Sequence, residues 1–281
     1  MTTAAVPPAV RWGWVADGGD VVTVPVLLSA RLVPWLRAWR AGMTSLDDVV
    51  EAMTSEGMSG VEQIVVTEAE IGPGATLTEG FSRLSGVDTE DIRLVLAVPG
   101  DARGLPTAGP FAAAALTAGE AVVAGRNGLV PERRAHTSGS GSTWETVLWH
   151  HFELDAVPVP ADLVSPGEAD ASLTQALRAA TKVLSDLDVA AWNPELGRAL
   201  AGARTDSGRQ LPPGFDTRSR RLYARAVMLE RVLRVADSDA MGGAVTAHEA
   251  AARLEALRGL AASCRTAIGA ACHARLHCGD R

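Results

Sequence analysis

The sequence predicts an α+β protein in which a mixed α/β domain with a small sheet is followed by an all-helical module of three to four helices. Short apolar runs of strand type alternate with short helical patterns as far as a Pro-rich stretch at 157–165, and beyond it every apolar pattern has helical spacing. With 281 residues, 47% hydrophobic and 21% charged, the composition is globular. We therefore expect a tail at 1–10, the mixed domain at 11–156, a linker at 157–165 and the helical domain at 166–281.

The first elements expected are a hairpin and a helix. The apolar runs Arg11–Val15 and Val21–Leu28 flank a Gly-rich turn, which is a hairpin signal. Apolar residues then recur at helical spacing up to Trp39. Because proline is tolerated in the first helical turn, Pro34 predicts that this helix begins at about residue 31 or later.

The remainder of the mixed domain alternates strands and helices. The β-branched run Val61–Thr67 favours a strand. The near-continuous apolar run Ile92–Val98 ends at Pro-Gly and is typical of a buried central strand. Pro110 is suited to open an alanine-rich helix at 111–118, and Thr143–Leu154 is expected to be a long strand. Short helices are also expected at 46–53 and 76–84, and a hairpin at 121–130.

The last part of the chain carries three long helical patterns, at 168–187, 218–236 and 247–276, with a short one at 194–203. Apolar residues recur at spacings of three and four, as in a helical bundle. The stripes are rich in alanine, which buries little area per residue. The module is therefore expected to dock on the mixed domain or on a second copy.

Composition excludes several classes of protein. A net charge of −7 argues against non-specific binding to nucleic acid or anionic lipid, and no run approaches the 18 apolar residues of a membrane span. The three cysteines all lie near the C-terminus, and no signal-peptide pattern is present at the N-terminus, which predicts a reduced, cytoplasmic protein. No nucleotide fingerprint is present, and no cofactor is expected.

One candidate ligand site is the loop between the apolar run at 92–98 and the helix that follows it. Gly100 and Gly104 would let a ligand approach the backbone, and Asp101 and Arg103 offer opposite charges. The alternative is a surface loop in which proline and glycine only set the turns. In the first interpretation the protein binds a small molecule or is an enzyme, with its ligand at residues 99–106.

The tryptophans are a candidate partner-binding group. Trp12 and Trp14 share one face of the predicted hairpin, and Trp35 and Trp39 share one face of the predicted helix. Packed together they would form part of the core. At an exposed edge they would form an aromatic anchor for a partner protein.

Histidine and cysteine gather in two places. His273 and His277 are four residues apart next to Cys278, but the second half of a zinc site is missing, so no metal is expected. In the strand at 143–154, His151 shares a face with Glu145 and Glu153, which suits either a general base or ordinary cross-strand pairs. Six arginines between 218 and 234 would bind phosphate or an acidic partner, or form a solvated helix face.

The segments SARLVPWLRAWRAG, VPGDARGLPTAGPFAAAALTAGEAVV and DSDAMGGAV resemble conserved hypothetical proteins of high-GC actinobacteria. The resemblance implies a source and brings no activity with it. Since the residues form no nucleophile–base pair, carboxylate dyad or complete metal set, we expect a non-catalytic cytoplasmic protein that acts through contacts with a protein partner or as a homodimer.

Overall fold

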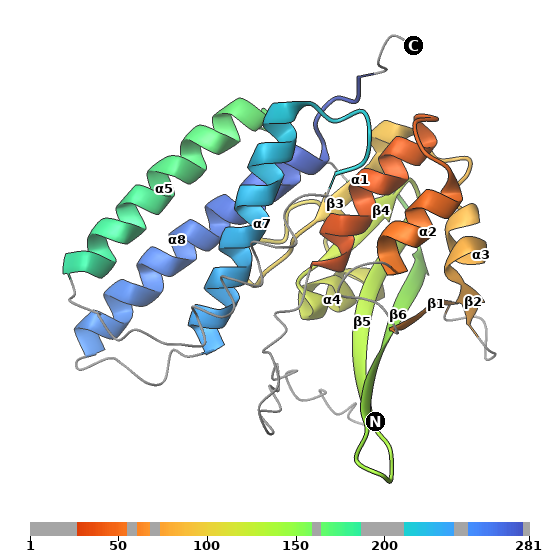
Figure 1. Cartoon of the computed structure of the whole chain (residues 1–281), viewed down its shortest axis with the longest axis horizontal. Coiled ribbons are helices and arrows are strands. Elements are labelled where there is room, and N and C mark those ends of the chain that lie inside the picture. The colour runs from red at the N-terminus through yellow and green to blue at the C-terminus, as the bar shows by residue number, and fades with distance from the viewer. Residues whose placement is uncertain are drawn as a thin grey trace.

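The computed structural model shows a mixed six-stranded sheet with helices on both faces, followed by a module of long helices, so the predicted fold class is confirmed. Figure 1 shows the sheet and its helices on one side and the long helices packed together on the other. The structure describes residues 27–54, 61–67, 74–158, 164–186, 211–238 and 247–277.

The strands run in the order β2-β1-β6-β5-β4-β3, and all neighbours are antiparallel except β1 and β6. The strands are β1 Glu62–Thr67, β2 Ala75–Thr76, β3 Ile92–Val95, β4 Ala121–Ala124, β5 Asn127–Thr137 and β6 Thr143–Glu153. The helices are α1 Leu28–Arg40, α2 Leu46–Thr54, α3 Leu77–Ser82, α4 Pro110–Ala118, α5 Pro166–Asp186, α7 Thr217–Ser238 and α8 Ala247–Cys272, with a single 3-10 turn at Thr89–Asp91.

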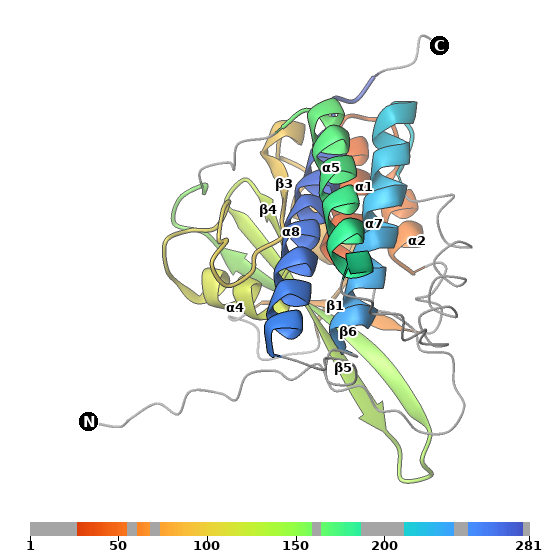
Figure 2. The same cartoon turned by 90° about the vertical axis from the view of Figure 1, so that its left-hand side faces the viewer.

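Alternating side chains of the sheet enter two cores. One face packs under α1, α2 and α3, where Trp149 is fully buried and meets Phe81 edge-on with ring centroids 6.2 Å apart. The other face packs under α4 through Phe111 and Ala115. The first core continues through α1 into α7 and α8, and Figure 2 shows these long helices lying beside α1. The two modules therefore share one continuous apolar interior.

The predicted start of α1 is wrong, because Pro34 lies in the interior of a helix that begins at Leu28. A proline there leaves the carbonyl of Ala30, four residues earlier, without its helical donor. The hydroxyl of Tyr223 on α7 donates to that carbonyl at 2.9 Å, and the thiol of Cys272 on α8 approaches it at 3.6 Å. The helical module thus supplies what the proline removes. The predicted hairpin at 11–28 lies outside the described residues, apart from Leu27 and Leu28.

We expect Tyr223→Phe to lower the free energy of unfolding by about 1–2 kcal/mol, because a buried carbonyl loses its main donor. In a Pro34→Ala background the new amide of residue 34 can donate to Ala30, so the same substitution should cost at least about 0.5 kcal/mol less. Urea denaturation of the four proteins measures both costs. An equal cost of Tyr223→Phe in both backgrounds would contradict this account of the contact.

The N-terminus of α1 is bound by a buried carboxylate. The amides of Leu28 and Ser29 donate to Glu120 at 3.2 and 2.6 Å. Burial raises the pKa of Glu120, while the amide of Ser29 and the charges of Arg234 and Arg133 oppose the rise. Glu120 immediately precedes β4, so this contact ties the start of α1 to the start of β4.

The C-terminus of α8 closes one edge of the sheet. The predicted central strand at 92–98 is instead the edge strand β3, which is buried because α1 and α8 cover it. The amide of Leu94 donates to Nε2 of His273 at 2.9 Å. Arg37, 2% exposed, donates to the carbonyls of Cys272 at 2.7 Å and Ala274 at 3.0 Å. These side chains satisfy main-chain groups that the sheet edge and the helix end leave open.

In the described part of the chain, no helix is both long enough and apolar enough to cross a membrane.

Candidate functional site: the β5–β6 arm

In the predicted ligand loop at 99–106, the two charged side chains pair with each other. Arg103 donates to both oxygens of Asp101, at 2.7 and 2.8 Å, and this contact lowers the pKa of Asp101. Gly100 and Gly104 both have positive φ, at 89° and 83°. The charge of Arg265 on α8 also lowers the pKa of Asp101. Its role as a ligand site stays a prediction.

The predicted tryptophan group is divided. Trp35 and Trp39 lie half-buried on α1 and pack against the main core, with the Arg40 guanidinium 5.3 Å from the Trp39 ring. Trp12 and Trp14 lie outside the described residues. The structure therefore shows two of the four at the margin of the core, and their binding role stays a prediction.

Of the C-terminal histidine and cysteine residues, Cys264, Cys272 and His273 face the interior, whereas His277 is exposed. Cys264 and Cys272 are buried free thiols, and burial raises the pKa of both. His273 contacts β3, and Cys278 lies outside the described residues. Among the residues that the structure describes, no group of three or more His, Cys, Asp or Glu is placed to hold a metal ion.

Two of the six arginines, Arg220 and Arg225, are held within the helical module, whereas Arg218 and Arg221 are exposed. Arg225 donates to Asp170 at 3.0 Å and to Thr174 at 2.9 Å, both on α5. Arg220 donates to the carbonyl of Phe215 at 3.0 Å, and also to the carbonyls of Leu211 and Pro212. These contacts hold α7 against α5 and fix the turn before α7.

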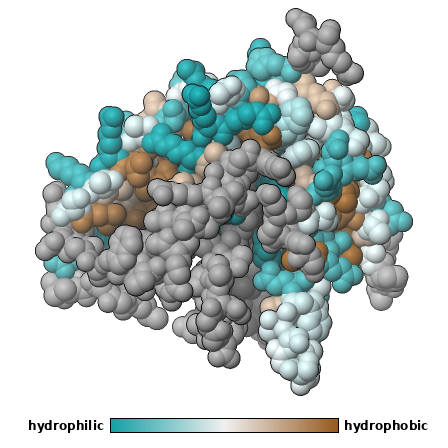
Figure 3. Space-filling model, viewed as in Figure 1, coloured by the Kyte–Doolittle hydropathy of each residue, from teal (hydrophilic) through white to brown (hydrophobic). Residues whose placement is uncertain are grey.

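A surface that the sequence did not single out is the outer part of the β5–β6 hairpin, which we call the arm: residues 130–146. Strand β1 accompanies β6 only as far as Thr146, and β4 accompanies β5 only as far as Leu129. Beyond these points β5 and β6 pair only with each other among the described residues. Figure 3 shows the arm projecting from the body, its tip nearly white because Ser, Thr and Gly are close to neutral in hydropathy.

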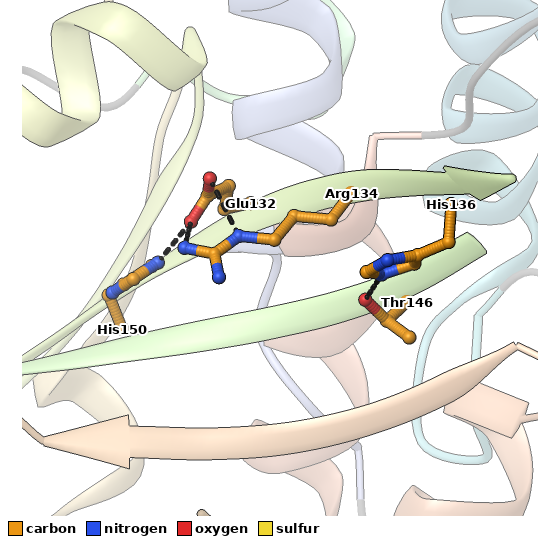
Figure 4. Close-up of polar contacts among 5 residues, drawn as sticks. All are labelled: Glu132, Arg134, His136, Thr146 and His150. Atoms are coloured by element: carbon orange, nitrogen blue, oxygen red, sulfur yellow. Dashed lines mark hydrogen bonds and ion pairs between the residues drawn. The ribbon is translucent and has the colours of Figure 1, made fainter. Parts of the chain in front are cut away.

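One face of the arm carries a connected set of polar side chains. Glu132 accepts from Arg134 at 2.9 Å and contacts Nε2 of His150 at 2.6 Å (Figure 4). The hydrogen bond from Arg134 is the main reason that the pKa of Glu132 is lowered. Glu132 and Arg134 lie two residues apart on β5, and His150, just beyond the arm, lies diagonally across from Glu132 on β6.

Nearer the tip the same face carries an aromatic pair. Trp144 lies directly opposite His136, and their rings stack with centroids 5.2 Å apart and planes 16° apart. Nε2 of His136 contacts the hydroxyl of Thr146 at 2.9 Å (Figure 4). Trp144 is 48% exposed, more than any other large hydrophobic side chain in the described chain. The arm thus presents a fixed, exposed aromatic ring beside charged groups.

The opposite face of the arm carries one ion pair. Arg133 lies 3.5 Å from Glu145, and its side chain is 20% exposed. Burial lowers the pKa of Arg133, and the charges of Glu120 and Glu145 oppose the lowering.

His151, predicted to lie near Glu145 and Glu153, contacts Asn127 at 2.9 Å, and burial is the main cause of its lowered pKa.

The arm was missed because its sequence has little strand signal. Pro131 and the charged run after it conceal the outer half of β5, for which only residues up to 130 were expected. The available signal was symmetry: β6 was predicted over 143–154, and an antiparallel partner of equal length had to precede the serine-rich turn. That turn closes at Ser138 and Ser142, whose backbone groups bond at 2.8 Å.

Comparison with known proteins identifies relatives over nearly the whole chain. A family model described as the N-terminal domain of Rv1486c-like proteins matches residues 29–163, and one for the C-terminal domain matches residues 167–269. Uncharacterised proteins of Mycobacterium tuberculosis H37Rv and Mycobacterium leprae are 27% and 26% identical, each over 89% of this chain and 97% of the relative. No solved structure matches the chain. With both domain models matched in order, the chain belongs to the Rv1486c-like family.

Proposed function

We propose that this chain is a non-catalytic cytoplasmic protein that acts through protein–protein contacts, and that the arm is its contact surface. The observation that carries the proposal is Trp144, held half-exposed against His136 at the outer end of the arm. Tryptophan and arginine are the residue types most enriched where alanine substitution weakens an interface most, and Arg134 lies on the same face, half-exposed.

The rigidity of the arm supports this role. Stacking and the contact with Thr146 fix the His136 ring, so a partner that covers Trp144 would immobilise few further rotamers. Arg134 is likewise held by Glu132 before any partner arrives. A surface arranged in advance loses less conformational entropy when it binds.

The titratable groups of the sheet and the core support a non-catalytic role. His151 contacts Asn127, and His273 accepts from the backbone of β3. The thiols of Cys264 and Cys272 have raised pKa values, so they hold their protons at neutral pH, unlike a catalytic thiolate.

The test is site-specific photo-crosslinking in the native host. Trp144 is replaced by a photoreactive phenylalanine derivative in the full chain, and Glu51, exposed on α2, receives the same replacement as a matched control. We expect light-dependent adducts of defined mass at position 144, several-fold more abundant than at position 51, and fewer when Arg134→Ala is added. Equal adducts at both positions, or none at 144 in a folded protein, would contradict the proposal.

A further inference from the structure

The outer part of β5 has an edge that no other described strand covers: from Val130 to Thr137 none lies beside β5 on the side away from β6. Val130 and Pro131 are buried, and the residues from Glu132 to Thr137 are half-buried or exposed. Pro131 fits such an edge, because proline within a sheet is found where its nitrogen faces no partner strand.

The backbone pairs Arg126–Leu154 and Ser138–Ser142 are hydrogen bonded, so the even-numbered residues of β5 bond to β6. The nitrogen of Pro131 and the amides of Arg133 and Ala135 therefore face outward. An open edge of this kind is a template for another strand.

We propose that this edge binds the same edge of a second copy of the chain, so that the two arms form one four-stranded antiparallel sheet. The inference rests on the proposed function and names a partner for the edge of the arm. A twofold axis through Arg133 places Glu132 of each copy directly opposite Arg134 of the other. Directly opposed charges of opposite sign stabilise antiparallel pairs.

Charge favours this register, because among the symmetric ones it alone places Glu132 directly opposite Arg134. It also sets the two Arg133 side chains against each other on the opposite face, but an axis through Arg134 or through Glu132 opposes two like charges without forming any Glu–Arg pair. With the axis at Arg133, the Glu132–Arg134 pair of each strand joins that of the other copy in a ring of four alternating charges. Each copy therefore contributes a group that completes the polar network of the other.

The opposite face of the joined arms contains one like-charge contact, between the two Arg133 side chains. Glu145 of the same arm lies 3.5 Å from each guanidinium and compensates its charge. Glu145→Gln should therefore weaken the association even though residue 145 lies on β6, away from the joined edges. Trp144 remains uncovered on the other face, because it also lies on β6.

The experiment measures the mass of the full chain in solution by light scattering and sedimentation over about a hundredfold range of concentration. We expect a dimer whose dissociation constant rises at least about tenfold with Glu132→Arg or with Arg134→Glu alone. The double variant Glu132→Arg/Arg134→Glu restores opposite charges across the axis, so it should return to within about threefold of the original constant. Glu51→Arg is the matched control, with the same change of charge away from the arm.

A second variant tests the main chain without changing charge. Ala135→Pro removes an outward amide and should weaken the dimer while leaving the secondary structure of the protein intact by circular dichroism. A monomer at every concentration overturns the proposal. So does a dimer whose dissociation constant is unchanged by both Ala135→Pro and the charge reversals. A double variant that dimerises as weakly as the single variants also overturns it. A monomer that still forms adducts with another protein at position 144 overturns this inference and leaves the proposed function standing.

Discussion

Arg37→Ala should lower the free energy of unfolding by about 3–5 kcal/mol, because the side chain joins three segments in the interior. Its guanidinium donates to the carbonyls of Cys272, Ala274 and Thr89, at 2.7, 3.0 and 3.3 Å. Alanine leaves these carbonyls without their donor and opens a cavity at the junction of α1 and α8. The ion pair with Glu90 adds little, since Glu90 is 88% exposed.

Chemical denaturation of the full chain measures the cost, with Arg40→Ala as the matched control. Arg40 lies on the same helix and, among the described residues, donates only to the carbonyl of Val87, at 2.8 Å, besides packing on Trp39. Its replacement should cost about 1 kcal/mol. A cost for Arg37→Ala no greater than that of Arg40→Ala would show that Arg37 does not hold the two modules together.

Acidification should destabilise the protein through His273. Burial, helped by the charge of Arg37, lowers the pKa of His273 to about 4, whereas the ordinary value is 6.5. Between these values the unfolded chain binds a proton that the folded chain does not bind. Stability is therefore lost as pH falls from about 6.5 to about 4, by a total of about 3 kcal/mol, and this contribution is constant outside that window.

The variant His273→Gln isolates the contribution of this histidine. Glutamine can still accept from the amide of Leu94 but does not titrate, so the stability difference between variant and original should shift towards the variant by about 3 kcal/mol between pH 7 and pH 4. His136→Gln on the arm is the control. Burial raises the pKa values of Glu120 and Glu230, so these two acids lower the stability of the protein as pH rises. Their contribution is the same in the variant and the original protein, so it cancels in the stability difference. A difference independent of pH would rule out a neutral buried His273.

Helical periodicity made the long helices predictable from the sequence. The stripes expected at 168–187, 218–236 and 247–276 became α5, α7 and α8 with small shifts of their ends. Local capping was equally informative: Ser45 accepts from the amide of Asp48 at the start of α2, and Gly119 ends α4 in the left-handed conformation.

The failures share a physical cause, which is that distant residues override a local rule. The start of α1 was misplaced because Tyr223 compensates for Pro34, and no local pattern shows a donor 193 residues away from Ala30. The strand at 92–98 was expected at the centre because it is apolar, but its cover is a helix from the end of the chain. The arm was missed because an exposed two-stranded hairpin needs no apolar alternation.

The contacts of α1 and β3 with the end of the chain bear on the order in which the protein can be completed during translation. The amide of Leu94 and the guanidinium of Arg37 find their partners 179 and 235 residues later, at His273 and Cys272. When the sheet of a nascent chain has already left the ribosome, the edge of β3 is still open and the Arg37 guanidinium still lacks its carbonyl acceptors, until the final residues emerge. Completion of the N-terminal half therefore waits for termination, and a chain that stops before His273 would carry that open edge permanently.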